Sequence, residues 1–210
     1  MHPNKIFRNA TGSQNMEFAR DRGFGTLMVA DGDDIHTAHL PFVMDHDTGE
    51  DDYRLGMHLV RSNPIARAVK GPRKAVITIL GPDGYISPDW YGDTPNLVPT
   101  WNYVAVTLTG TLTPSPDAAL RSLLERTSHE FERRLDKPEW KINKVSDDAF
   151  AKMARQIVPY TFNVDSIDGT WKLGQNKPED ARLGAAGALR ESNVGSGLTQ
   201  LSHLMEKPPT

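Results

Sequence analysis

The run Arg61-Ser62-Asn63 places a guanidinium, a hydroxyl and an amide in consecutive positions, directly before Pro64. A strand is predicted to end here, and Ser62 or Asn63 can cap a helix whose first position Pro64 occupies. These side chains, with the free backbone N–H groups of a helix start, favour a phosphate. A surface ion pair is the commoner role of an arginine, so both interpretations of Arg61 stay open.

Residues 81–103 form an unusually aromatic stretch, and its four prolines exclude a helix and fix much of the backbone in extended or turn geometry. Five rings with polar tips lie in it: Tyr85, Trp90, Tyr91, Trp101 and Tyr103. Such rings suit a wall that contacts a planar ligand or a partner subunit. A loop packed over an edge of the core explains the composition equally well.

A third segment, residues 169–176, combines a cation, a ring and two amides in Lys172, Trp171, Gln175 and Asn176. The alternative interpretation is a capped turn leading into a helix that Pro178 opens. Taken together, the three segments could converge on one flat, phosphorylated ligand.

Four histidines, His36, His39, His46 and His58, fall in two predicted hairpins, but their spacing argues against a metal site. The separation of His36 and His39 is odd, so in a strand they point to opposite faces. No His-Glu-x-x-His helix occurs in the sequence. We therefore expect no metal, and favour a structural or cofactor-contacting role for these histidines.

Several classes of catalytic site are excluded or unsupported. The chain has no cysteine, which excludes disulfides, thiolate catalysis and cysteine-ligated metal centres. Ser62 and Ser87 lack a Gly-x-Ser-x-Gly elbow, which makes acyl transfer an unsupported reading. No Gly-x-Gly-x-x-Gly or Walker loop occurs, so classical dinucleotide and nucleoside triphosphate folds are unsupported too.

The composition is that of an ordinary folded domain. The chain has 210 residues, 38% of them hydrophobic and 24% charged. With 24 basic against 27 acidic residues the net charge is -3, which gives no general attraction to nucleic acid. The N-terminus does not resemble a signal peptide, and no apolar run is long enough to cross a bilayer, so we expect a cytoplasmic protein.

The elements that must position these residues are mostly strands. A short helix is expected between a Ser13 cap and Gly23. Turns at residues 31–34 and 47–50 predict two successive hairpins and therefore an antiparallel meander. The predicted strands are residues 25–30, 35–43, 53–59, 75–80, 104–112 and 160–167.

Helices are predicted at residues 65–69 and 118–135, and another is capped by Ser146 and carries Phe150, Met153 and Ile157. The result is a mainly β fold with added helices (α+β). We expect one domain over residues 1–190, with inserted helices at about 115–157. Residues 191–210 are expected to be a C-terminal tail or a short helix that carries Leu198, Leu201 and Leu204.

Five blocks resemble, together and in order, the PaiB-type family of FMN-binding negative transcriptional regulators. They are residues 37–41, 56–64, 81–91, 98–103 and 172–176, within a match over roughly residues 5–189. The resemblance implies an antiparallel FMN-binding split β-barrel, pyridoxamine-phosphate-oxidase-like, with the flavin at a homodimer interface. Asp89 and Gly174 depart from the family, which more often has serine at both positions.

The resemblance also implies site residues. It gives the FMN phosphate to Arg61, Ser62 and Asn63, and isoalloxazine contacts to Thr37, His39 and His58. It gives the other side of the pocket, contributed by the second subunit, to Trp101, Asn102, Lys172 and Gln175.

Three functions remain open at this stage. The resemblance implies a flavin-binding transcriptional regulator, although no helix-turn-helix is evident and the charge gives no support for DNA contact. The alternative is an FMN-dependent oxidoreductase using NAD(P)H or a small substrate, with His58 or Tyr103 as proton donor. The third is a flavin store without turnover.

Overall fold

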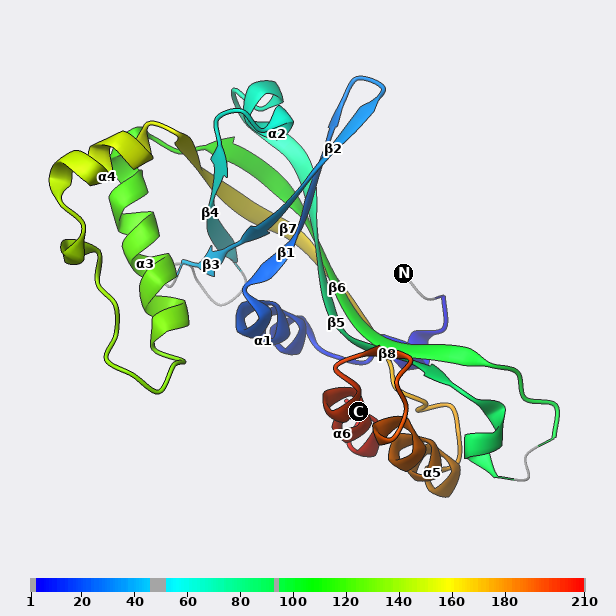
Figure 1. The fold of residues 1–210 in the computed structure, drawn as a ribbon. Coiled ribbons are helices and arrows are strands. Elements are labelled where there is room, and N and C mark those ends of the chain that lie inside the picture. The colour runs from blue at the N-terminus through cyan, green and yellow to red at the C-terminus, as the bar shows by residue number, and fades with distance from the viewer. Residues whose placement is uncertain (1–2, 46–51, 93–94, 210) are drawn as a thin grey trace. The chain divides into compact units, whose positions relative to one another are not determined.

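The computed structural model describes residues 3–45, 52–92 and 95–209 (Figure 1). The predicted turn at residues 47–50 and His46 lie outside the described residues. The strands are β1 (Phe24–Asp31), β2 (Asp34–Pro41), β3 (Val43–Met44), β4 (Arg54–Val60), β5 (Arg73–Ile86), β6 (Thr100–Pro114), β7 (Ile157–Lys172) and β8 (Gly195–Ser196). The α-helices are α1 (Gly12–Arg22), α2 (Pro64–Ala68), α3 (Leu120–Glu132), α4 (Asp147–Ala154), α5 (Glu179–Arg190) and α6 (Leu198–Glu206).

The strands form one eight-stranded sheet in the order β2-β1-β5-β6-β7-β4-β3, with β8 paired to β5. The pairs β1–β2, β1–β5, β3–β4, β4–β7 and β5–β8 are all antiparallel. The prediction of a mainly β, antiparallel fold with added helices is therefore confirmed. The chain packs as two compact units, which we call the terminal unit (residues 1–18, 79–107 and 167–210) and the central unit (residues 19–78 and 108–166).

The central unit is built on the β1–β2 hairpin and on β4. Gly32, with φ of +63°, makes the tight hairpin turn, as the Asp-Gly sequence predicts. β2 and β4 lie far apart in the strand order, yet they contact each other. The sheet therefore curls without closing, as a split barrel does. Its interior is filled by one face of each strand, with Leu27 and Leu55 fully buried.

Helix α3 packs against β4 in the central unit because Gly56 leaves room for it. A Cβ at Gly56 would lie 2.7 Å from Leu123 Cδ1. Leu120 and Leu123 are the buried side chains of this helix, as the predicted apolar face requires. Arg134, just beyond the helix, donates to the carbonyls of Arg20 and Asp21 at the end of α1.

The terminal unit has its own core. Trp171 and Leu173, at the end of β7, pack with Leu189 from α5 and with Leu201 and Met205 from α6. α5 and α6 lie side by side near β8 (Figure 1). The predicted helix around Leu198, Leu201 and Leu204 is confirmed, and it belongs to this core.

Buried polar groups fix two further contacts of the terminal unit. Trp171 Nε1 donates to Asn15 Oδ1 at 2.8 Å. The buried Arg182 donates to the carbonyls of Met205 and Glu206, at the C-terminal end of α6. A guanidinium at a helix C-terminus satisfies carbonyls that have no partner within the helix.

The structure corrects several sequence-based expectations. Thr11, not Ser13, caps α1, because Thr11 Oγ1 accepts from Gln14 N while Gln14 Oε1 accepts from Thr11 N. The meander is only partly right: β1 pairs with β2 and β3 pairs with β4, as the two predicted hairpins require, but β4 also pairs with β7, and β2 lies at the opposite end of the sheet. Ile157 begins β7 instead of ending α4.

The aromatic stretch at residues 81–103 is also not one loop. β5 continues to Ile86 and β6 begins at Thr100, with a 3-10 turn at Pro88–Tyr91 between them. No helix among the described residues is long and apolar enough to span a bilayer.

Candidate functional site

Thr37 and His39 lie on the exposed face of β2 in the central unit, where they alternate with the buried Ala38 and Leu40. His39 Nδ1 lies 2.9 Å from Thr26 Oγ1 on the paired strand β1, which orients the imidazole. The predicted opposite orientation of His36 is confirmed by this alternation. Thr37 and His39 can therefore contact a ligand laid against this face.

His58 lies on β4, and it is half-buried. Burial lowers the pKa of His58 below its ordinary value of 6.5, because the charged imidazolium is poorly solvated there. The neutral ring can both donate and accept a hydrogen bond, as a contact to a polar heterocycle requires.

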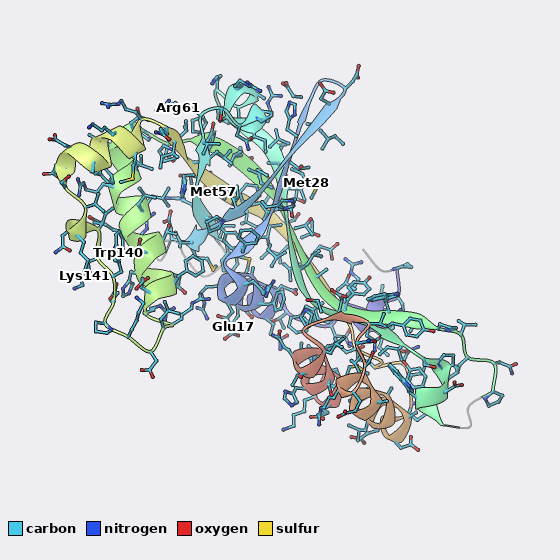
Figure 2. All side chains as sticks on the ribbon, viewed as in Figure 1. Glu17, Met28, Met57, Arg61, Trp140 and Lys141 are labelled. Atoms are coloured by element: carbon cyan, nitrogen blue, oxygen red, sulfur yellow. The ribbon has the colours of Figure 1, made fainter. Side chains whose placement is uncertain are left out.

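Arg61 directly follows β4 (Figure 2), and its guanidinium contacts a backbone carbonyl and a carboxylate. Arg61 Nε donates to the Arg155 carbonyl at 2.8 Å. Its Nη2 lies 3.5 Å from Asp117 Oδ1, and the two side chains are 50% and 78% exposed. An ion pair this exposed contributes little, so the outer edge of the guanidinium is available to a stronger anion.

Asn63 has a structural role that the sequence predicted. Its Oδ1 accepts from Ile65 N at 2.9 Å and caps α2, with Pro64 at the first helical position. Ser62 is exposed in the turn between β4 and α2. Because α2 contacts both β2 and β4, these residues belong to one region of the central unit, with Thr37, His39 and His58 on the neighbouring strands.

The other four predicted residues lie in the terminal unit, where a cavity of about 390 Å³ gathers two of them. We call it the terminal cavity. Most of its lining residues carry polar side chains: Asn4, Phe7, Tyr91, Asn96, Leu97, Val98, Thr100, Asn102, Lys172, Asn176 and Lys177. No aspartate or glutamate is among these described residues, so its formal charge comes from two lysines.

A tight turn after β7 positions the two lysines. Gly174 adopts φ of +83°, and Lys177 N donates to the Gly174 carbonyl at 2.9 Å. Gln175 stabilises the turn, since its side chain donates to the Trp171 carbonyl at 2.6 Å and accepts from Leu173 N at 2.8 Å. Lys172 donates to Thr100 Oγ1, and burial lowers the pKa of Lys172.

Asn102 and Trp101 differ in their surroundings. Asn102 is 1% exposed, and its Nδ2 donates to Met205 Sδ at 3.5 Å. Trp101 is 45% exposed and packs edge to face against Tyr85, with ring centroids 6.4 Å apart. Trp101 and Gln175 are not among the residues that line the terminal cavity.

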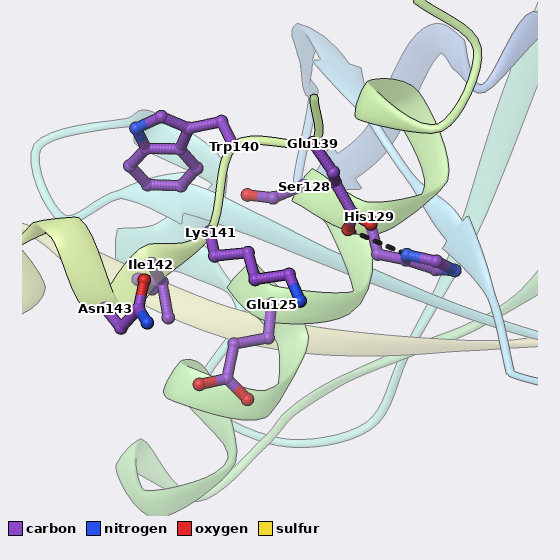
Figure 3. Close-up of a pocket in the computed structure, with 8 residues that line it drawn as sticks. All are labelled: Glu125, Ser128, His129, Glu139, Trp140, Lys141, Ile142 and Asn143. Atoms are coloured by element: carbon purple, nitrogen blue, oxygen red, sulfur yellow. Dashed lines mark hydrogen bonds and ion pairs between the residues drawn. The ribbon is translucent and has the colours of Figure 1, made fainter. Parts of the chain in front are cut away.

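A second cavity, of about 320 Å³, lies in the central unit between α3 and residues 139–143 (Figure 3). Glu139 Oε1 lies 2.8 Å from His129 Nδ1 and closes one side of it. It contains none of the predicted site residues.

Two solved proteins share this split-barrel fold. The FAD and heme binding protein from Mycobacterium smegmatis has a TM-score of 0.57 at 14% identity, over 90% of this chain and 82% of that one. The flavocytochrome Anf3 from Azotobacter vinelandii has a TM-score of 0.53 at 13% identity, over 81% and 72%. These likenesses confirm the predicted fold class.

The sequence comparison identifies the family. Residues 1–166 match the model of the family described as "Putative FMN-binding domain", and the chain belongs to this family. The "Protease synthase and sporulation protein PAI 2" of Bacillus subtilis is 26% identical over 207 residues, which are 98% of this chain and 97% of that protein. The "Uncharacterized protein YKL070W" of Saccharomyces cerevisiae is 31% identical over 127 residues, 55% of this chain and 74% of that protein. The predicted family and the predicted cofactor, FMN, are thus confirmed.

The central-unit residues fit the cofactor. A phosphate needs an anchored cation with an exposed edge, which Arg61 provides, and the ring needs polar and planar side chains on an accessible face, which Thr37 and His39 provide. Sequence reasoning missed Arg155, whose carbonyl holds Arg61, and Lys177, which shares the terminal cavity with Lys172. Gly174 is the residue in the sequence that could have indicated the role of Lys177, because a turn at a glycine can bring Lys172 and Lys177, five positions apart, to the same side.

Proposed function

We propose that this chain binds FMN at an interface between two copies of itself and that the bound flavin serves regulation. The phosphate lies against Arg61, Ser62 and Asn63, and the isoalloxazine ring lies against Thr37, His39 and His58. Trp101, Asn102, Lys172 and Gln175 approach from the second copy. The observation that carries this proposal is the guanidinium of Arg61, whose Nε donates to the Arg155 carbonyl while its Nη2 has a long, exposed contact with Asp117.

The phosphate assignment follows from the state of Arg61. Its Nε is committed to the Arg155 carbonyl, which fixes the direction of the planar guanidinium. Its Nη2 lies 3.5 Å from the exposed Asp117 carboxylate. A phosphate dianion can accept two hydrogen bonds from such a guanidinium, and it therefore displaces the weak carboxylate contact.

The interface assignment follows from the outer face of β2 and β1. Opposed residues on this face include Thr37 with Met28 and Ile35 with Ala30. Ile35 is 72% exposed and Phe24, also on this face, is 50% exposed. An apolar face that also carries the ring-contacting Thr37 and His39 suits a second copy, because the flavin and the apolar side chains are then covered together.

The bound FMN supplies electron or hydride transfer, and the chain supplies binding and orientation. The half-buried His58 stays neutral near pH 7, so it presents a hydrogen-bonding ring without a positive charge. The regulatory part of the proposal is supported by the relative from Bacillus subtilis, whose name contains the words "protease synthase and sporulation protein". With a net charge of -3, regulation through a protein partner is favoured over direct DNA contact.

Replacing Arg61 tests the phosphate assignment. R61A should weaken FMN about tenfold or more, since one charge-assisted contact contributes about 1.5–3 kcal/mol, and should leave riboflavin unchanged because it has no phosphate. The quenching of flavin fluorescence measures both affinities. R67A is the matched control, an exposed arginine on α2, and should change neither.

Two results would contradict the assignment. Equal losses of FMN and riboflavin in R61A would show that Arg61 does not contact the phosphate. Equal losses of FMN in R61A and R67A would reduce the effect to general charge.

A further inference from the structure

The second cavity, between α3 and residues 139–143, lies wholly within the central unit, and we call it the α3 cavity. Its volume of about 320 Å³ lies at the lower end of the usual range for small-molecule sites, about 300–1,000 Å³. None of the residues that we assign to FMN lines it. Flavin binding therefore does not account for the side chains that gather there.

Two contacts hold residues 139–143 against α3. Glu132, at the end of the helix, accepts a hydrogen bond from Trp140 N at 2.8 Å and also pairs with Lys137. Three residues earlier on the helix, His129 Nδ1 lies 2.8 Å from Glu139 Oε1. Both walls of the α3 cavity are thus fixed by the fold, so a ligand need not order them on binding.

The lining contains four ionisable side chains, those of Glu125, His129, Glu139 and Lys141. His129 and Glu139 contact each other. The Glu125 carboxylate and the Lys141 ammonium form no ion pair or hydrogen bond within the described part of the chain. In Figure 3 the Lys141 side chain extends toward α3, which carries Glu125. One free carboxylate and one free ammonium therefore share a single cavity.

The rest of the lining can take up an apolar group. Trp140 and Ile142 are partly buried and contribute an indole ring and an alkyl side chain. Ser128 and Asn143 add a hydroxyl and an amide, which can form hydrogen bonds with a charged group of a ligand. The cavity thus combines both signs of charge with an apolar wall.

We infer that the α3 cavity binds a free α-amino acid with an aromatic or large apolar side chain. The ammonium group of the ligand contacts Glu125, its carboxylate contacts Lys141, and its side chain lies against Trp140. An α-amino acid carries its two opposite charges close together and has no net charge, which matches a lining with one free charge of each sign. A ligand with a single charge would instead meet a like charge at Glu125 or at Lys141.

Three probes that share one ring and differ in their charged groups test this inference, by calorimetry on the full chain. L-phenylalanine carries both groups, L-phenylalaninamide keeps the ammonium without the carboxylate, and 3-phenylpropanoate keeps the carboxylate without the ammonium. Phenylalanine should bind at least about fivefold more tightly than either of the others, the effect of one ion pair at an open site. No binding of phenylalanine at millimolar concentration, or equally tight binding of either counterpart, would overturn the inference.

Two variants assign each charge of the ligand to its residue. E125Q should weaken phenylalanine and phenylalaninamide about fivefold and should not weaken 3-phenylpropanoate. K141M should weaken phenylalanine and 3-phenylpropanoate about fivefold and should not weaken phenylalaninamide. K144M is the matched control, since Lys144 is an exposed lysine of the same segment outside the cavity lining, and it should change none of the three affinities.

Each contrary result is distinct. Unchanged phenylalanine affinity in a folded E125Q or K141M, or an equal loss in K144M, would overturn the assignment. A parallel loss of FMN and phenylalanine in E125Q or K141M would make the cavity a part of the flavin pocket and would also overturn it. Unchanged FMN affinity in R61A would instead count against the proposed phosphate site alone.

Discussion

Gly174 sets the geometry of the terminal cavity, and its replacement gives a quantitative test. Its φ of +83° lies in the region that residues with a Cβ rarely adopt. A Cβ built there would lie 3.5 Å from Arg182 Cγ and 3.7 Å from Asn102 Nδ2, which are ordinary contacts. G174A should therefore cost only the backbone term, about 1–2 kcal/mol of the free energy of unfolding.

A second glycine in the same unit serves as control. Gly187 lies in the exposed face of α5, and nothing lies within 4 Å of its Cβ position. G187A should stabilise the protein by about 0.5–1 kcal/mol, because alanine favours a helix interior more than glycine does. G174N should lose less than G174A, since asparagine tolerates a left-handed backbone better.

Urea unfolding followed by tryptophan fluorescence measures these differences in the free energy of unfolding of the terminal unit. Of the four tryptophans, Trp90, Trp101 and Trp171 lie in the terminal unit and Trp140 lies in the central unit. A W140F background makes the signal report the terminal unit. If G174A and G187A changed the unfolding midpoint in the same direction and by the same amount, the strain argument would be refuted.

Two further predictions concern the central unit. The folded-state pKa of His58 is lowered, so the unfolded chain takes up the proton first as the pH drops. The free energy of unfolding therefore falls as the pH drops from above 6.5 through the lowered folded-state pKa. H58Q removes this proton uptake, so its free energy of unfolding should fall less on acidification. Urea titrations at several pH values measure this, and an unchanged slope in H58Q would contradict it. G110A should destabilise the protein by at least about 2 kcal/mol, because its Cβ would lie 2.1 Å from the Asn163 carbonyl oxygen; a thermal melt that matches the unsubstituted protein would disprove that clash.

Local signals in the sequence predicted the parts of the fold that depend on neighbouring residues. The Asp-Gly turn after β1, the Asn63-Pro64 start of α2 and the Ser146 cap of α4 all appear as expected. Each depends on a dihedral preference or on a hydrogen bond a few residues away. Such features can be read without knowledge of the rest of the chain.

Strand length could not be predicted in the same way. β5 runs for 14 residues through Gly81-Pro82, whereas the sequence predicted a strand that ends at residue 80. A Cβ at Gly81 would lie 2.6 Å from Phe18 Cζ, so the glycine is required by a helix distant in sequence. The path of β4 to β7 likewise depends on pairing partners about a hundred residues apart.

The residues of the candidate site likewise divide into those that the sequence alone could group and those that only the fold brings together. Arg61, Ser62 and Asn63 are contiguous, and their grouping could be predicted from the sequence alone. The terminal cavity joins the N-terminal segment, the loop before β6 and the turn after β7, so its composition required the structure. Trp171 is a residue for which the sequence suggested a ligand contact, but it is a buried core side chain whose Nε1 donates a hydrogen bond to Asn15.

The placement of charge distinguishes the cations that we assign to FMN from the paired cations of this protein. The chain has a net charge of -3, so its acidic residues outnumber its basic ones. Many of its cations form ion pairs: Arg8 with Asp168, Lys74 with Asp165, and Arg121 with Asp147. Arg61 has a long, exposed ion pair with Asp117, and the described residues that line the terminal cavity include no carboxylate beside its lysines. FMN has one phosphate group, which Arg61 can hold, and we propose that Lys172 of the second copy approaches the same flavin. Since burial has lowered the pKa of Lys172, an anionic ligand beside it should raise that pKa again, and the uptake of protons on binding FMN, compared between buffers of different ionisation enthalpy, would carry that signature.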